Sequence, residues 1–308
     1  MSRQIDRMLV RPACLPRWCD PKERLTLAGL LSELATCEVI IADNVAHYWA
    51  SGNDQEMWDW TDDFPCLAPP FESFWIECRA PRLMVSEVTG TQILPYLEGW
   101  GAYVEARRNP EGGWKLMLAL FVEVRKWRST FMGGMSFDID EKGVCPKSID
   151  TAGRNHSISY AVPFAPRMVA SGVSEMEFKG LVGAWVQPLA LAICFMNCKN
   201  VELIERVPIP RLSRAHEHRH GRGLVTYHTL EIDPMRRVLR SEGREEEVGL
   251  RHALHICRGH FKDYREHGLF GKRHGVYWWD SHVRGEIESG VTLKDYVVAG
   301  MDTEPPRA

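Results

Sequence analysis

The chain has 308 residues, 44% of them hydrophobic, and its formal net charge is −3 at pH 7. This length can bury a full core in one large domain or two smaller ones, and the near-balanced charge gives no global sign of a nucleic-acid partner. The opening residues MSRQIDRMLV lack the apolar core of a signal peptide, which argues against export. Nine cysteines without such a signal favour reduced thiols, so we expect a cytoplasmic protein.

A first helix is predicted over residues 21–36. Asp20 is a suitable N-cap, Pro21 suits the first helical position, and four leucines then recur at helical spacing. The same pattern leaves open a continuation of this helix toward His47.

Four segments of strand character follow, and the short sequence NPEGG between the second and third is typical of a hairpin loop. Such segments pair most simply with their neighbours in the chain, so we expect an antiparallel sheet. The predicted strands are 71–79, 100–108, 114–126 and 130–140.

Three of these strands carry an acid and an arginine two residues apart, on one face of each strand. An acidic metal site of the nuclease kind would also need a lysine after the acid and a second aspartate, and neither is evident. We therefore expect cross-strand ion pairs on the solvent face of the sheet. The acid and the arginine that share a strand are Glu77 and Arg79, Glu105 and Arg107, and Glu123 and Arg125.

A second helix is predicted over 174–197, with Ser174 and Glu177 in capping-box spacing. Its apolar part, 181–197, is short for a membrane span and contains Gln187 and Pro188, so we expect a buried core helix and no contact with a membrane. Cys194 and Cys198 lie four residues apart on this helix, where we expect them to be buried in packing and not to bind metal.

These elements predict an α+β fold in which helices 21–36 and 174–197 cover an antiparallel sheet. The polar stretch 208–223 is interpreted as a linker, followed by a strand at 224–233 and a smaller strand-rich module. We expect a core domain at 1–205, a basic, histidine-rich module at 206–300 and a disordered tail at 301–308.

The last third of the chain differs from the rest in charge. Lys and Arg outnumber Asp and Glu between residues 206 and 285, and ten of the twelve histidines lie there. This asymmetry indicates that the segment binds something anionic.

The run 250–264 concentrates the groups that titrate or bind phosphate. A helix fits its apolar spacing, but the aromatic triplet in 276–285 favours a hairpin that pairs the two segments. In a regular strand His255 and His260 point to opposite faces, and a bulge at Gly259 would bring them to one face.

Three chemistries fit this hairpin. Zinc suits the ligand types, but the spacing matches no standard finger, so we expect no cofactor and keep zinc as the alternative; its ligands would be His255, Cys257, His260 and His282. A metal-independent nuclease would use His260 and His255 as acid–base pair with Arg258 beside the phosphate, and Tyr264 is a further candidate catalytic residue.

Plain nucleic-acid binding is the third chemistry. Basic side chains would contact phosphate, and Trp278 or Trp279 would offer a stacking face. The basic candidates are Arg251, Arg258, Lys262, Lys272, Arg273 and Arg284. The alternative to all three is that the histidines are satisfied polar groups and the tryptophans form the core of the module.

The strings HICRGHFKDY, GLFGK and YWWDSHVRG, with FMNCKNVELIE and PPFESFWIEC upstream, resemble a group of uncharacterised proteins encoded by bacteriophages and prophages. The resemblance implies a bacterial host cytoplasm and assigns no catalytic residue. The chain lacks the phosphate loop, dinucleotide fingerprint, nucleophile elbow and zincin helix, so an ATPase, dehydrogenase or serine hydrolase of standard pattern is not expected.

We therefore expect a nucleic-acid-binding or polyanion-binding phage protein with a nuclease activity as one outcome. The alternative is a non-enzymatic protein that docks on a host or phage protein as inhibitor or scaffold.

Overall fold

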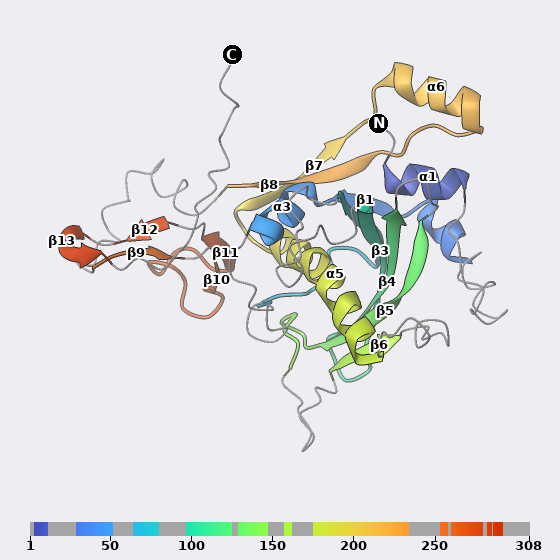
Figure 1. Ribbon diagram of the computed structural model, residues 1–308. Helices are drawn as coiled ribbons and strands as arrows, with labels where there is room; N and C mark the ends of the chain where they lie inside the picture. The colour runs from blue at the N-terminus through green and yellow to red at the C-terminus, as the bar shows by residue number, and fades with distance from the viewer. Residues whose placement is uncertain are drawn as a thin grey trace, which may run out of the picture.

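A mixed eight-stranded sheet is the largest element of the computed structural model (Figure 1), with strand order β6-β5-β4-β3-β2-β1-β8-β7. Its strands are β1 (Glu38–Ile41), β2 (Ser73–Arg79), β3 (Leu97–Arg108), β4 (Trp114–Val124), β5 (Thr130–Ile139), β6 (Ile158–Ala161), β7 (Val201–Arg206) and β8 (Tyr227–Ile232). The structure describes residues 3–11, 29–51, 64–79, 97–124, 129–146, 157–161, 175–233, 253–257, 260–279, 282–284 and 286–291.

The four strands predicted between residues 71 and 140 are β2 to β5, and each pairs with its neighbour in an antiparallel ladder. The hairpin loop at NPEGG is also confirmed. The Asn109 N–H donates to the Gly113 carbonyl at 3.2 Å, and Gly112 and Gly113 both adopt positive φ values that favour glycine.

The predicted antiparallel architecture is wrong, because β1 runs parallel to both of its neighbours, β2 and β8. The four residues of β1 occupy part of the segment through which the first helix was expected to continue. Val39, Ile40 and Ile41 are β-branched and buried, so they favour a strand that is covered on both faces over an amphipathic helix.

The prediction that two helices cover the sheet is wrong as well. The helices of the described residues are α1 (Gln4–Val10), α3 (Asp43–Ser51), α5 (Glu175–Met196) and α6 (Pro210–His220), together with a helical stretch at 29–34. Only α5 is long, and it crosses one face of the sheet (Figure 1), so the fold is a strand-dominated mixed α/β fold and not a sheet covered by helices. Of the helix predicted at 21–36, residues 21–28 lie outside the described part.

The second predicted helix is confirmed as α5, and it is a core helix. Residues 185–195 of α5 are all buried, and most of them belong to the one large apolar cluster between α5 and the sheet. Cys194 and Cys198 are buried as expected, and the Cys198 thiol donates to the Cys194 carbonyl at 3.4 Å. No helix in the described residues is both long enough and apolar enough to span a membrane.

The opposite face of the sheet holds two of the predicted surface acids, and both are buried. Glu77 and Glu123 are each 4% exposed. Glu77 accepts the backbone N–H groups of Gln4 and Ile5 at 3.0 and 2.9 Å, and Glu123 pairs with Arg7 of the same helix, α1. The expectation of solvent-face ion pairs is therefore wrong for these two, because α1 covers them.

Glu105 is partly exposed, but its ion pair is not the cross-strand pair that was expected. Its carboxylate pairs with Arg107 of the same strand at 2.7 Å, and the Arg107 side chain is exposed. The third arginine of the pattern, Arg125, lies outside the described residues.

The stretch interpreted as a linker is instead the ordered connection between β7 and β8. It contains α6, and β8, predicted as a strand at 224–233, returns into the main sheet between β1 and β7. The main sheet thus extends beyond residue 206, where the second domain was expected to begin. The division into domains stays a prediction, and the tail 301–308 lies outside the described residues.

Five shorter strands complete the described chain. A two-stranded sheet contains β10 (His260–Asp263) and β11 (Val276–Trp279), and a three-stranded sheet has the order β12-β9-β13 with β9 (Ala253–Cys257), β12 (His282–Arg284) and β13 (Glu286–Val291). β10 pairs with β11, and β9 with β12, both antiparallel, which confirms the hairpin predicted between 250–264 and 276–285.

Candidate nucleic-acid interface

Helix α6 is the most exposed helix of the described structure, and none of its residues is buried. Its ends are set by the sequence. Pro210 occupies the first turn, where a missing N–H costs no helical hydrogen bond, and Gly221 adopts a left-handed conformation with φ 76° that ends the helix. Arg219 and two histidines in the last turn complement the negative end of the helix dipole.

One side of α6 is held by the segment that returns to β8. The Leu224 N–H donates to Ser213 Oγ at 3.0 Å, and His216 Nδ1 lies 2.8 Å from the Arg222 carbonyl oxygen. This returning segment is itself fixed to α1, because the Val225 N–H donates to Asp6 Oδ1 at 3.0 Å. The helix is thus positioned by specific contacts although it buries no apolar face.

The other side of α6 presents cations to solvent. Arg211, Arg214 and His218 are exposed and recur at helical spacing on the side opposite Ser213 and His216, and Arg219 is exposed beside them. Within the described part of the chain, no acid forms an ion pair with these three arginines, so their charge remains available to an anionic partner.

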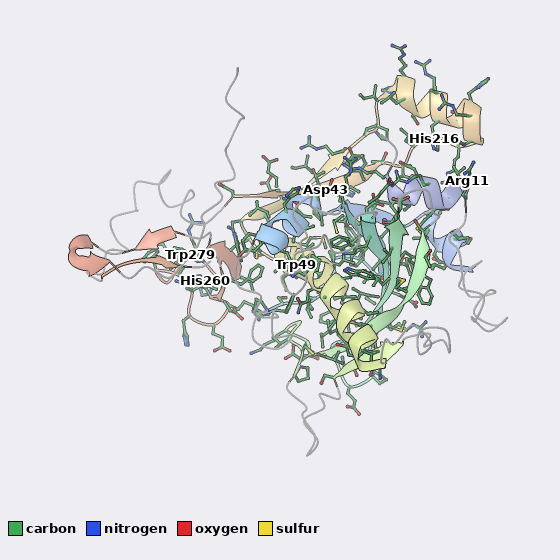
Figure 2. The ribbon with its side chains drawn as sticks, viewed as in Figure 1. Arg11, Asp43, Trp49, His216, His260 and Trp279 are labelled. Atoms are coloured by element: carbon green, nitrogen blue, oxygen red, sulfur yellow. The ribbon has the colours of Figure 1, made fainter. Side chains whose placement is uncertain are left out.

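The inner side of α6 adds two histidines. The ring centroids of His216 and His220 are 4.6 Å apart. Figure 2 shows His216 on the side of α6 that faces the end of α1, where Arg11 lies. The pKa of His220 is lowered, and desolvation is the largest cause. The nearby His216, Arg219 and Arg11 act in the same direction, so the neutral ring is favoured.

Three apolar side chains are exposed at the start of this connection. Val207 is 72% exposed, Ile209 63% and Leu212 48%. Large apolar side chains in one short exposed segment are a feature that protein interfaces share.

The two tryptophans predicted as stacking faces are buried instead. Trp278 is 2% exposed, and its ring centroid lies 4.8 to 5.1 Å from those of Tyr48, Phe195 and Phe261. Trp279 is 6% exposed and packs in a small cluster with Tyr264, Leu269 and Tyr277. Neither ring offers a free face to a base, so both act as core residues of the hairpin.

The hairpin is docked on the main sheet through its backbone. Asn200, in the turn after α5, donates its side-chain N–H to the Trp278 carbonyl and accepts the Trp278 N–H, both at 3.0 Å. The Lys199 N–H also donates to the Val276 carbonyl at 2.9 Å.

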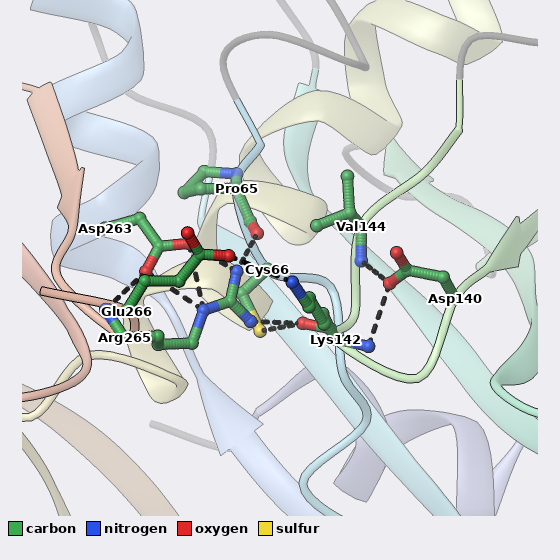
Figure 3. A network of polar contacts seen from close by, with 8 residues as sticks. All are labelled: Pro65, Cys66, Asp140, Lys142, Val144, Asp263, Arg265 and Glu266. Carbon is green, nitrogen blue, oxygen red and sulfur yellow. Dashed lines mark hydrogen bonds and ion pairs between the residues drawn. The ribbon is translucent and has the colours of Figure 1, made fainter.

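A polar network makes a second contact between the hairpin and the sheet (Figure 3). Arg265 pairs with Asp263 and donates to the backbone carbonyls of Lys142 and Pro65 at 2.5 and 3.4 Å. Lys142 in turn pairs with Glu266 at 3.2 Å. Arg265 is therefore occupied in holding the hairpin.

The predicted phosphate contacts of the hairpin are only partly placed. Lys262 lies over the Trp279 ring, 4.5 Å from its centroid, Lys272 is exposed and Arg273 is half-buried. Tyr264 is half-buried against Tyr277, and burial raises the pKa of its hydroxyl. Arg251 and Arg258 lie outside the described residues, and only the backbone position of Arg284 on β12 is described.

The register of the hairpin bears on the predicted histidine pair. Cys257 pairs with His282, and His260 pairs with Trp279. The bulge expected at Gly259 falls on residues outside the described part, so it stays a prediction. The backbone register places His255 opposite Arg284.

The described residues contain no group of three or more metal-ligating side chains. This absence does not test the proposed zinc ligands His255, Cys257, His260 and His282, since His260 is the only one of the four whose side chain is described. Figure 1 shows α6 well apart from the β10–β11 hairpin, so these two described parts of the basic stretch do not form one surface.

The arginines of α6 were missed as binding residues because the stretch was interpreted as a linker. The spacing of Arg211, Arg214 and His218 was the signal that could have revealed a helical face.

No family model, curated protein or solved structure matches this chain. The resemblance to phage and prophage proteins therefore stays a prediction.

Proposed function

We propose that the protein binds nucleic acid, or a polyanion of similar charge density, and that the outer side of α6 is the contact surface. The observation that carries the proposal is the set of exposed arginines on a helix that buries none of its residues. A helix without an apolar face gains little from packing, so its placement at the outside of the sheet is better explained by a partner.

The dimensions of α6 suit a phosphate backbone. At a rise of about 1.5 Å per residue, Arg211 and Arg219 lie about 12 Å apart along the helix. That length corresponds to about three or four nucleotides of one duplex strand at about 3.4 Å each. The arginine fork matches phosphate geometry and keeps its charge at all relevant pH values.

Such a contact would recognise the charge of the phosphates and not the identity of the bases. α6 carries no Phe, Tyr or Trp, its exposed side has only the imidazole of His218, and Trp278 and Trp279 are buried, so a row of stacking platforms for single-stranded bases is not supported. The proposal therefore predicts sequence-independent binding through phosphates, in the bacterial host cytoplasm that the resemblance to phage proteins implies.

Two charge-matched variants test the proposal. Replacement of Arg211, Arg214 and Arg219 by Ala should weaken binding of a fluorescently labelled DNA or RNA duplex by about tenfold or more, because three phosphate contacts are lost. Replacement of Lys262, Lys272 and Arg273 removes the same charge from the hairpin and should change the affinity less than threefold, about 0.6 kcal/mol. Equal losses in both variants would mean that only net charge matters and would overturn the proposal.

A second candidate function is docking on a host or phage protein, and the exposure of Val207, Ile209 and Leu212 favours it. The same experiment separates the two functions. A wild-type protein that binds neither duplex nor single strand at low salt, yet purifies with a stoichiometric protein partner that Val207→Ser and Ile209→Ser release, would replace the nucleic-acid proposal with docking.

A further inference from the structure

We propose that His216 and His220 form a two-histidine site for a divalent transition-metal ion with tetragonal preference, Cu²⁺ or Ni²⁺. The two residues lie one helical turn apart on α6, and their ring centroids are 4.6 Å apart with an interplanar angle of 50°. This site goes beyond the proposed function, since it concerns the inner side of the helix and a different ligand.

The hydrogen bond of His216 prepares its ring for a metal. A carbonyl oxygen can only accept, so Nδ1 must donate its proton to the Arg222 carbonyl at 2.8 Å. In the neutral ring the lone pair then resides on Nε2. A metal-binding histidine is held in the same way, with its second ring nitrogen donating to a backbone carbonyl or carboxylate.

The separation of the rings fits two ligands at a right angle around one ion. A metal–nitrogen bond is about 2.0–2.1 Å, and the ring centroid lies about 1.2 Å farther out. Two imidazoles at a right angle around one ion would then have centroids about 4.5 Å apart, and at a tetrahedral angle about 5.2 Å. The observed 4.6 Å matches the right angle of square-planar and octahedral ions.

The donor set excludes hard cations as the ligand, because the site offers imidazole nitrogen, whereas Mg²⁺ and Ca²⁺ need carboxylate or carbonyl oxygen. Arg11 and Arg219 add positive charge near His220, which opposes every cation alike, so only an ion with high affinity for imidazole nitrogen is expected to bind. Among the described residues no third ligating side chain joins the pair, so water or a donor from a bound molecule completes the coordination. The order of affinity should be Cu²⁺ above Ni²⁺, with Zn²⁺ below Cu²⁺.

Calorimetric titration of the full chain with Ni²⁺ alone, in a non-chelating buffer, tests the site. We expect His220→Ala to weaken the tightest Ni²⁺ site at least about tenfold, because a chelating second ligand raises effective concentration strongly. His218→Ala is the matched control, since it removes a histidine from the same helix on its outer side, and it should leave the affinity unchanged within twofold.

His220→Ala keeps the contact between His216 and Arg222, so we expect α6 to stay folded in this variant. Circular dichroism checks that it does. Copper loading gives a second readout, because the electron paramagnetic resonance spectrum should lose one nitrogen coupling in His220→Ala. Equal Ni²⁺ affinities in the wild type, His220→Ala and His218→Ala would overturn the proposal. The titration contains no nucleic acid, and the Arg211→Ala, Arg214→Ala, Arg219→Ala variant keeps both histidines, so the two proposals fail independently.

Discussion

Glu77 is the residue on which α1 depends. Its carboxylate accepts the N–H groups of Gln4 and Ile5 and, at 2.7 Å, the indole N–H of Trp75, all in a buried setting. Burial raises the pKa of Glu77, while the hydrogen bonds from Trp75, Ile5 and Gln4 act in the opposite direction. Three donors satisfied by one side chain make this carboxylate hard to replace.

Glu77→Ala should therefore lower the free energy of unfolding by about 3 kcal/mol, because three buried donors lose their acceptor. Urea denaturation measures this. Glu105→Ala is the control from the same sequence pattern, and it should cost less than about 0.5 kcal/mol because its ion pair is largely exposed. A similar small loss in both variants would show that Glu77 does not anchor α1.

At the scale of elements, the β10–β11 hairpin is held by Arg265. Partial burial acts to raise the pKa of Asp263, but the hydrogen bonds and charge of Arg265 outweigh it and lower that pKa. A carboxyl with a lowered pKa adds stability above its ordinary pKa, and this stability is lost as the pH falls through the lowered value.

Arg265→Ala should reduce the free energy of unfolding by about 1 kcal/mol at pH 7, since a half-exposed pair is screened by solvent. The difference from the wild type should shrink as the pH falls below the ordinary aspartate value near 3.8. Hydrogen exchange should also speed up in β10 and β11. Lys272→Ala, on the same hairpin but exposed, should do neither, and a pH-independent difference for Arg265→Ala would refute the role of its pair with Asp263.

The elements also mark the limit of prediction from sequence. β2 to β5 were predictable because they are long, apolar and joined by recognisable turns. β1 was not, since its four residues include three consecutive buried apolar ones, Val39 to Ile41, which show no alternation. Helix α6 was missed for the opposite reason: it has no apolar face, and what fixes it are contacts of Ser213 and His216 with the returning chain.

The candidate site was predictable only as a region. The excess of Lys, Arg and His in the last third is visible in the sequence. The burial of Trp278 depends on Phe195 of α5, a contact across more than eighty residues that no local pattern encodes. The choice between the hairpin and α6 therefore needed the three-dimensional arrangement.

For the whole molecule, the hairpin contacts the residues just before β7 and α6 follows just after it, so the two basic segments lie at opposite ends of this strand, and we propose that the polyanion binds at α6. A protein of net charge −3 repels a polyanion on average, so binding must come from a local concentration of cations. Local phosphate contacts release counterions, and their number can be read from the dependence of affinity on salt.

The slope of log affinity against log salt concentration for a DNA duplex tests this assignment most directly. We predict that removal of Arg211, Arg214 and Arg219 lowers the magnitude of the wild-type slope by about 2 to 3, close to 0.9 for each lost phosphate contact. Removal of Lys262, Lys272 and Arg273 should leave the slope within about 0.5 of the wild-type value. An unchanged slope in the α6 variant, or a larger fall in the hairpin variant, would contradict the assignment of nucleic-acid binding to α6.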